Sequence, residues 1–177
     1  FPEYKDEIET FVANRFVKAL REQLPNERSF GDPRKLAEDD FDFEVETAGG
    51  SKFYLEPQEA ASMDGTSYDA ACGQRNCKEY VERVLSTNEA KATKYRNSGS
   101  GRLILLLYAT DYKFLPVTEE VELFRYRLEG MDHPFTEVYF FSPSELGGDR
   151  VYKLFPTDSA EGFDPERTKR MFVIPFG

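Results

Sequence analysis

The sequence predicts a mixed α/β fold in which a central β-sheet is flanked by helices. Three observations lead to this prediction: separate segments with helical spacing of apolar residues, an acidic pair of strands between the first two such segments, and the continuous apolar run 103–107. The expected chain order is α-β-β-α-β-α-β. A length of 177 residues fits a single domain, 1–177, with room for a substantial core.

The first expected element is an amphipathic helix over residues 6–24. Asp6 and Glu7 suit its N-terminus, where the helix dipole favours negative charge, and Pro25 ends it. Its apolar residues recur at intervals of three and four along the chain: Ile8, Phe11, Val12, Phe16, Ala19, Leu20 and Leu24. The polar residues 25–40 predict a loop.

Two strands are expected next, at about 41–47 and 52–58, with a two-glycine hairpin turn between them. Acidic and apolar residues alternate along both strands, so Asp42 and Glu56 project from the same face of the hairpin. Two carboxylates held side by side repel each other unless a cation lies between them. Carboxylate oxygens suit Mg²⁺ and Mn²⁺, so the hairpin predicts a metal site.

The remaining elements alternate between helix and strand. Residues 60–77 show no clear periodicity and predict a long surface loop. Residues 102–108 predict a central strand, because a continuous apolar run fits a strand that is covered on both faces. A strand, a crossover helix and a second strand then form a parallel pair. The other expected elements are a helix over 78–96, a helix from a Thr118 cap to Gly130, a strand over 137–141, and edge strands over 151–155 and 171–175.

The composition narrows the function. A formal net charge of −10 disfavours charge-driven binding to nucleic acid over the whole surface. It leaves room for a nuclease, because metal ions neutralise acidic active sites and basic patches can be local. The longest apolar run is too short to cross a bilayer, and no N-terminal segment has the pattern of a signal peptide. We therefore expect a cytoplasmic protein that does not enter a membrane.

The chain contains two cysteines and one histidine. Cys72 and Cys77 are too few for a zinc cage without other ligands, and both a reduced pair and a small disulfide loop are open. His133 would have to serve alone in any Ser-His-Asp or Cys-His arrangement. Histidine-based nucleophilic catalysis is therefore not expected.

From about Glu7 to Phe141, the chain resembles the restriction-endonuclease-like superfamily, the nucleases named for their PD-(D/E)XK signature. Asp42, followed by an aromatic residue, matches the signature aspartate that opens a strand, and Glu56 matches the acidic residue on the next strand. The first helix of these nucleases often carries a metal-binding glutamate, for which Glu9 is the best match and Glu7 the second. The resemblance implies a restriction-endonuclease-like core.

The sequence departs from the family at the lysine position, where Gln58 stands two residues after Glu56. A glutamine can orient a water molecule but cannot supply the positive charge of a lysine. Helix-borne lysines sometimes replace the strand lysine in this fold, which makes Lys91 and Lys94 the candidates here. Pro57 removes a backbone donor from the strand, which suits an edge position or a bulge.

The resemblance also implies the chemistry of the site. Asp42, Glu56 and Glu9 would bind Mg²⁺ or Mn²⁺, with a backbone carbonyl of Pro57 or Gln58 as a further ligand. A metal-bound water would attack a phosphodiester in line, and Gln58 would position that water.

Three functions stay open. The first is a Mg²⁺-dependent endodeoxyribonuclease that hydrolyses phosphodiester bonds in DNA, and the resemblance allows a homodimer. The second is a nuclease-fold protein that has lost catalysis and binds nucleic acid or protein. The third is an acidic mimic of DNA. The carboxylates Glu9, Asp42 and Glu56 favour the first, whereas Gln58, Pro57 and the net charge favour the second.

Overall fold

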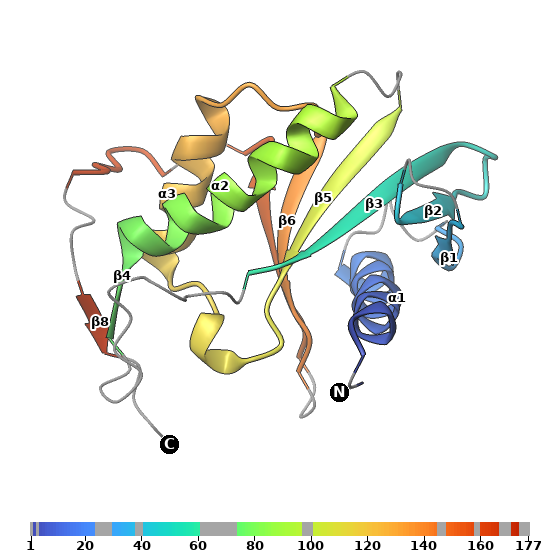
Figure 1. The fold of residues 1–177 in the computed structure, drawn as a ribbon, viewed down its shortest axis with the longest axis horizontal. Helices are drawn as coiled ribbons and strands as arrows, with labels where there is room; N and C mark the ends of the chain where they lie inside the picture. Colours follow the sequence, from blue (N-terminus) through green and yellow to red (C-terminus); the bar gives the residue numbers. More distant parts are fainter. Residues whose placement is uncertain are drawn as a thin grey trace.

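The computed structural model describes residues 2, 4–23, 30–37, 41–60, 74–96, 101–144, 148–157, 160–166 and 171–173. Within these residues, the protein is built on a six-stranded mixed sheet with helices on both faces (Figure 1). The mixed α/β class expected from the sequence is confirmed. The elements are α1 (Lys5–Gln23), β1 (Arg34–Lys35), β2 (Phe43–Glu46), β3 (Lys52–Glu59), β4 (Gln74–Asn76), α2 (Cys77–Tyr95), β5 (Arg102–Tyr108), a short 3-10 helix (Tyr112–Phe114), α3 (Thr118–Glu129), β6 (Glu137–Ser142), β7 (Arg150–Phe155) and β8 (Met171–Val173).

The strands of the large sheet lie in the order β1-β2-β3-β5-β6-β7. The neighbours β3 and β5 run parallel, as do β5 and β6, and the other neighbouring pairs are antiparallel. The two parallel pairs follow the crossovers through α2 and α3, as helical crossovers require. The expected parallel pair of strands 102–108 and 137–141 is confirmed.

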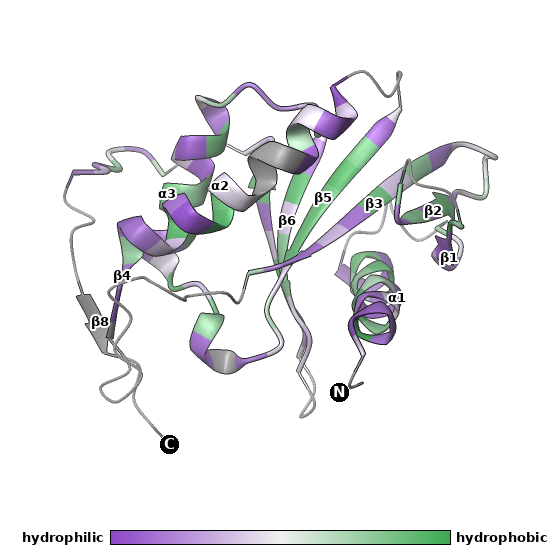
Figure 2. Ribbon diagram, viewed as in Figure 1, coloured by the Kyte–Doolittle hydropathy of each residue, from purple (hydrophilic) through white to green (hydrophobic). Residues whose placement is uncertain are grey.

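Strand β5 lies at the centre of the core. Its side chains alternate between two clusters, with Leu103, Leu105 and Leu107 on the side of α2 and α3 and Ile104 and Leu106 on the side of α1. Both faces of the strand are therefore buried, which explains why it is hydrophobic from Leu103 to Leu107 (Figure 2). Complete burial of each such leucine contributes about 1.5–3 kcal/mol relative to exposure.

Aromatic side chains attach the helices to the sheet. On one face, the Phe16 ring of α1 meets the rings of Tyr139 and Phe141 at centroid distances of 5.3 and 5.7 Å. On the other face, the Phe124 ring of α3 lies 6.0 Å from Tyr80 of α2 and 6.1 Å from Phe140 of β6. These edge-to-face and tilted contacts give the core the aromatic content seen in the sequence.

Several short elements differ from the sequence expectations. The predicted loop 25–40 contains β1, which pairs with β2, and the predicted loop 60–77 ends in β4, although residues 61–73 lie outside the described part. Strand 151–155 is an edge strand of the large sheet as expected. Of the strand predicted at 171–175, the described part Met171–Val173 pairs with β4 in a separate two-stranded sheet, and residues 174–175 lie outside the described residues. Strands of two or three residues are too short to show a period of two in the sequence.

The third helix begins one residue earlier than expected. Val117, not Thr118, is its N-cap, and the Val117 N–H donates to the Glu120 carboxylate at 3.0 Å. Glu120, at the third position of the helix, therefore caps the N-terminus with its carboxylate, which accepts a hydrogen bond from the backbone N–H of the N-cap residue. The helix ends at Gly130 as predicted.

A buried ion pair joins β4 to α3. Arg75 is 1 % exposed, and its guanidinium contacts both carboxylate oxygens of Glu120, with an Nε–Oε1 distance of 2.9 Å. It also donates to the backbone oxygens of Lys113 and Leu115 and lies over the ring of Tyr80. Because every charged group is matched by hydrogen bonds, the arginine can be buried.

No helix in the described part of the chain is long and apolar enough to cross a membrane.

Candidate functional site

The hairpin of β2 and β3 places the two predicted carboxylates opposite each other. Phe43 of β2 pairs with Leu55 of β3, so Asp42 just before β2 lies across from Glu56. The turn after β2 is closed by the Thr47 N–H to Ser51 O bond at 2.8 Å, and Gly50 adopts a positive φ of 78° there. The predicted glycine turn thereby sets the register of the two carboxylates.

Asp42 and Glu56 are joined by a hydrogen bond. The Asp42 N–H donates to Glu56 Oε1 at 2.8 Å, which fixes one oxygen of the glutamate. The Glu56 side chain is completely buried, whereas the Asp42 side chain is 36 % exposed. The pair therefore combines one buried and one accessible carboxylate.

Lys91 of α2 brings a positive charge to both carboxylates. Its Nζ lies 3.4 Å from Asp42 Oδ2, 3.3 Å from Glu56 Oε2 and 2.9 Å from the carbonyl oxygen of Pro57. One ammonium is thus held by three oxygens of the hairpin. Of the two helix lysines predicted as candidates, Lys91 reaches the carboxylates. Lys94 packs instead over the ring of Tyr95, 4.9 Å from its centroid.

Pro57 lies in the part of β3 that pairs with β5 but no longer with β2. The pairing of β2 with β3 ends at Leu55, whereas the pairing with β5 continues through Glu59. Pro57 therefore has a strand on only one side, and its carbonyl is directed to the open side, where it accepts from Lys91. The missing N–H of the proline removes no sheet bond there, in keeping with the expected edge position.

The first helix contributes a third carboxylate. Glu9 of α1 is 8 % exposed and pairs with Lys5 one turn away, at 3.6 Å. Burial raises the pKa of Glu9, and the nearby negative charge of Asp42 raises it further, while Lys5 and Lys91 act in the opposite direction. Glu9 therefore lies within electrostatic range of Asp42 and Lys91, but among the described residues it does not join Asp42 and Glu56 in a group of three carboxylates that could hold a metal. Glu7, the second sequence candidate, is exposed.

The environment also raises the pKa of Glu56. Burial is the main cause, and Asp42 adds to it, whereas Lys91, Tyr95 and the Asp42 N–H stabilise the ionised form. Negative charge in the cluster is thus incompletely compensated by Lys91. A second cation would lower the energy of the ionised cluster.

Gln58 lies beside the cluster, against α2. Its Nε2 donates to Thr87 Oγ1 at 2.7 Å, and Thr87 precedes Lys91 by one helical turn. Its Oε1 is buried and has no hydrogen-bond partner among the described residues. Gln58 therefore connects β3 to α2 through its amide nitrogen, and its amide oxygen is left as a buried acceptor without a partner among the described residues.

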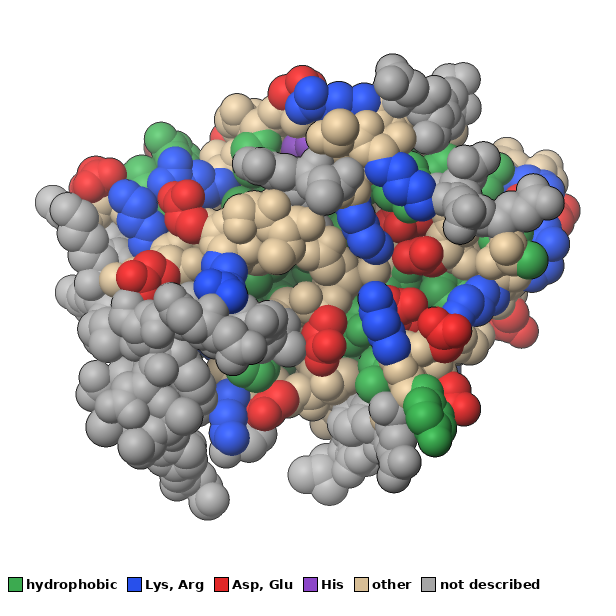
Figure 3. Space-filling view, in the orientation of Figure 1, with side chains coloured by type: hydrophobic (Ala, Val, Ile, Leu, Met, Phe, Trp, Pro, Cys, Tyr) green, Lys and Arg blue, Asp and Glu red, His purple; other side chains and the backbone are tan. Residues whose placement is uncertain are grey.

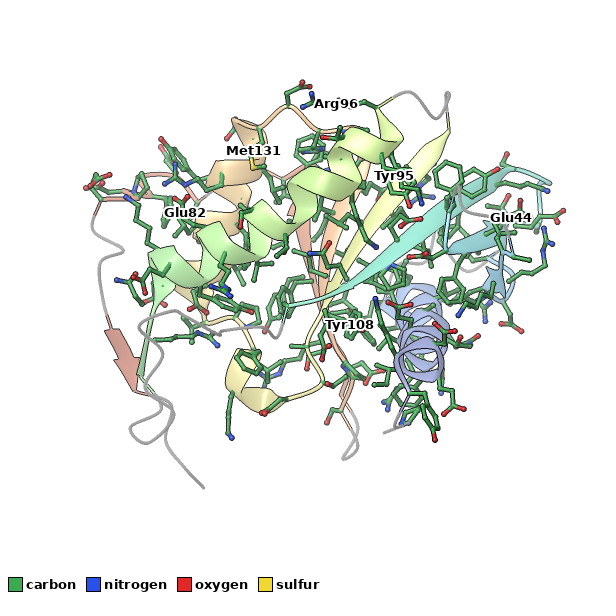
Figure 4. All side chains as sticks on the ribbon, viewed as in Figure 1. Glu44, Glu82, Tyr95, Arg96, Tyr108 and Met131 are labelled. Carbon is green, nitrogen blue, oxygen red and sulfur yellow. The ribbon has the colours of Figure 1, made fainter. Side chains whose placement is uncertain are left out.

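An aromatic wall beside the carboxylates was not predicted. The Phe41 ring stacks on Tyr54 at 4.2 Å and on Tyr95 at 5.3 Å between centroids, both at 18°. Tyr95 lies at the C-terminal end of α2 (Figure 4). Its side chain also forms a hydrogen bond with Glu56. The sequence does indicate that Tyr95 lies near the site, because Tyr95 follows Lys91 by four residues and so lies on the same face of the helix.

The donors present fit a divalent cation. Two carboxylate oxygens and one carbonyl oxygen surround a single cationic nitrogen, and hard oxygen donors are the ligands that Mg²⁺ and Mn²⁺ prefer. The described residues contain no group of three or more His, Cys, Asp or Glu side chains that could hold a metal. A metal here would therefore rest on Asp42, Glu56 and the Pro57 carbonyl, completed by water, with Glu9 in the surrounding shell.

Basic and acidic side chains are interspersed on the face shown in Figure 3. Near the hairpin, Arg34 and Lys52 both pair with Glu44, at 2.7 and 3.2 Å, and Lys35 pairs with Asp6 at 3.3 Å. These cations are compensated by carboxylates within the same region. This face therefore attracts a polyanion only weakly at long range, and any attraction is limited to individual side chains.

The remaining sequence candidates lie elsewhere or outside the described residues. His133 is half-buried and lines a cavity of about 330 Å³ beneath the C-terminal ends of α2 and α3. Cys77 is a free, buried thiol at the start of α2, and burial raises its pKa to about 12, so it stays protonated. Cys72 lies outside the described residues. None of these groups takes part in the carboxylate cluster.

Comparison with known proteins gives no match: no family model, no curated protein and no solved structure matches the chain. The function is therefore inferred from the geometry of the site.

Proposed function

We propose that the protein is a Mg²⁺-dependent nuclease with a restriction-endonuclease-like core, and that it hydrolyses phosphodiester bonds in DNA. The observation that carries this proposal is the convergence of Asp42, Glu56 and the Pro57 carbonyl on one cation position, beside a helix-borne lysine. The antiparallel hairpin followed by two parallel strands, with α1 on one face and α2 on the other, supports the proposed fold.

Each residue has a distinct role in the proposal. Asp42 and Glu56 hold the metal, and the hydrogen bond between them keeps Glu56 from rotating. When bound, the metal supplies a nucleophile at neutral pH and stabilises charge on the phosphate. Lys91 places its ammonium where it can neutralise charge that develops on the phosphate oxygens in the transition state. Gln58 would position the attacking water through its Oε1, which is buried and has no hydrogen-bond partner among the described residues, once a water molecule enters beside it.

A catalytically silent binding module is the second candidate. One observation favours it: Lys91 already satisfies all three hairpin oxygens without a metal. In that case the cluster is a structural ion pair, and neither Mg²⁺ nor Mn²⁺ changes the properties of the protein.

Cleavage assays separate the two candidates. Single-stranded and double-stranded DNA are incubated with the wild type and with Asp42→Asn, in Mg²⁺, in Mn²⁺ and in chelator. Glu46→Gln is the matched control, because Glu46 is exposed and lies on the same hairpin. The proposal expects metal-dependent cleavage in the wild type and the control, and a loss of at least 10²-fold in Asp42→Asn. Equal cleavage by all three proteins would assign the activity to another site.

A further inference from the structure

We infer that Lys91 is a tethered cation that occupies the metal position in the free protein and leaves it when a phosphate of the substrate binds. This inference rests on the proposed function and adds a regulatory property to the same site. It makes the binding of metal and of substrate phosphate mutually dependent.

The ammonium of Lys91 is fully matched by the hairpin. It has three N–H donors, and three oxygens from Asp42, Glu56 and Pro57 lie within 2.9 to 3.4 Å of its nitrogen. Asp42 and Glu56 contribute the charge, and Pro57 contributes a carbonyl that no neighbouring strand uses. In the absence of metal, the lysine thus substitutes for a divalent ion.

The lysine and a metal cannot use these oxygens at the same time. A Mg²⁺ ion binds its oxygens at about 2.1 Å, so an ion bound to the same three oxygens would lie in close contact with the ammonium nitrogen. Two positive charges at such a distance repel strongly in a partly buried site. Metal binding therefore requires the ammonium to move.

The surroundings allow the lysine to move while the carboxylates stay. The Lys91 side chain is 28 % exposed and has a flexible four-carbon stem, whereas Glu56 is completely buried and is fixed by the Asp42 N–H. The nearest favourable place for the displaced ammonium is an anion at the mouth of the site. A substrate phosphate supplies that anion, and so compensates the lysine for the contacts it gives up.

Reciprocity follows from this exchange. If phosphate binding removes Lys91 from the metal position, phosphate increases the affinity for metal, and metal increases the affinity for phosphate by the same factor. Removing the ammonium removes the competition and the part of the coupling that depends on Lys91. A neutral residue at position 91 is therefore expected to bind metal more tightly, although it abolishes a catalytic group.

Calorimetric Mn²⁺ titrations test the inference on the wild type, Lys91→Met and Lys78→Met. Lys78→Met is the matched control, because it removes the same charge from the same helix outside the site. Each protein is titrated with and without a hexathymidylate that carries phosphorothioate linkages, which retain the negative charge. We expect Lys91→Met to bind Mn²⁺ at least tenfold more tightly than the wild type and Lys78→Met. The oligonucleotide should tighten Mn²⁺ binding by a larger factor in the wild type than in Lys91→Met, where only the direct contact between metal and phosphate couples the two.

The outcomes separate this inference from the proposed nuclease activity. If the wild type cleaves DNA but Lys91→Met binds Mn²⁺ no more tightly, the inference is wrong and the nuclease proposal stands. If Lys91→Met binds Mn²⁺ more tightly but the wild type cleaves nothing, competition at the metal position is supported and the nuclease proposal is wrong. If none of the proteins binds Mn²⁺, both are overturned.

Discussion

At the scale of single residues, the ionised form of Glu56 lowers the stability of the folded protein, as is common for groups in functional sites. Its pKa is raised above the ordinary value of 4.5, chiefly by burial, so the folded protein favours the neutral form of this side chain. Its contribution to stability is therefore fully present below the ordinary pKa and is lost as the pH rises through the raised pKa. At neutral pH, the ionised glutamate opposes folding unless a metal compensates it.

This sign gives a stability prediction for Glu56→Gln. Without metal at pH 7, we expect the variant to be more stable than the wild type by about 0.5–2 kcal/mol, because glutamine retains the shape without the charge. The difference should shrink as the pH falls toward 4.5. Urea denaturation at several pH values measures it, with Glu46→Gln as the exposed control. A variant less stable than the wild type at pH 7 would show that the ionised glutamate stabilises the fold.

At the scale of elements, the proposed site receives from helix α2 the positive charge that restriction-endonuclease-like nucleases carry on the strand. Gln58 occupies the strand position and contacts Thr87, whereas Lys91, one turn along the helix, supplies the ammonium. We therefore expect Lys91→Met to lower DNA cleavage by about 10²-fold. Adding Gln58→Lys to this variant should restore at least tenfold, because it returns an ammonium to the same side of the sheet. Cleavage rates of the single and double variants test this. If the double variant recovers no activity, a lysine at position 58 cannot take the place of Lys91, which contradicts the proposed role of Lys91.

The ion pair between β4 and α3 makes a separate prediction about stability. Arg75→Met leaves Glu120 buried without its partner, so we expect a loss of about 3–5 kcal/mol in the free energy of unfolding. Arg127→Met, which removes a partly exposed partner of Glu82, should cost at most about 1 kcal/mol. Urea denaturation of both variants measures the difference. Equal, small losses would mean that Arg75 is not the connection between the two elements that the structure describes.

The sequence predicts long elements better than short ones, because a longer element has more residues that show its hydrophobic pattern. The bounds of β5 are predicted correctly, because burial on both faces produces a long apolar run. β1 and β4 are missed, because two or three residues carry no periodicity. Arg75 is missed for another reason: an arginine between polar residues is normally exposed, and only the fold reveals its buried partner.

The arrangement of the candidate residues follows from the sequence to a similar extent. Asp42 and Glu56 follow from strand alternation and the turn, because the pairing of Phe43 with Leu55 is set locally. The choice between Lys91 and Lys94 could not be made from the sequence, because both lie near the end of one helix, and only packing on β3 decides which of them faces the carboxylates.

At the scale of the whole molecule, the net charge of −10 limits how the protein can bind DNA. Cations near the hairpin are paired with carboxylates, so few phosphates can be neutralised without a metal. We therefore expect no binding to a DNA duplex at micromolar protein in 150 mM salt with chelator, and measurable binding after addition of a divalent ion. Fluorescence anisotropy with labelled DNA measures both. Tight binding in chelator would instead favour a metal-independent binding module.

The central claim is that the hairpin holds a divalent metal at the position of the Lys91 ammonium. A crystal structure of the wild type grown with Mn²⁺ and measured for anomalous scattering tests it most directly. We predict an anomalous peak at about 2.1 Å from oxygens of Asp42, Glu56 and Pro57, with the Lys91 ammonium displaced from its present contacts. The absence of a peak at saturating Mn²⁺, with Lys91 still bound to the three oxygens, would contradict the metal site and favour a catalytically silent protein.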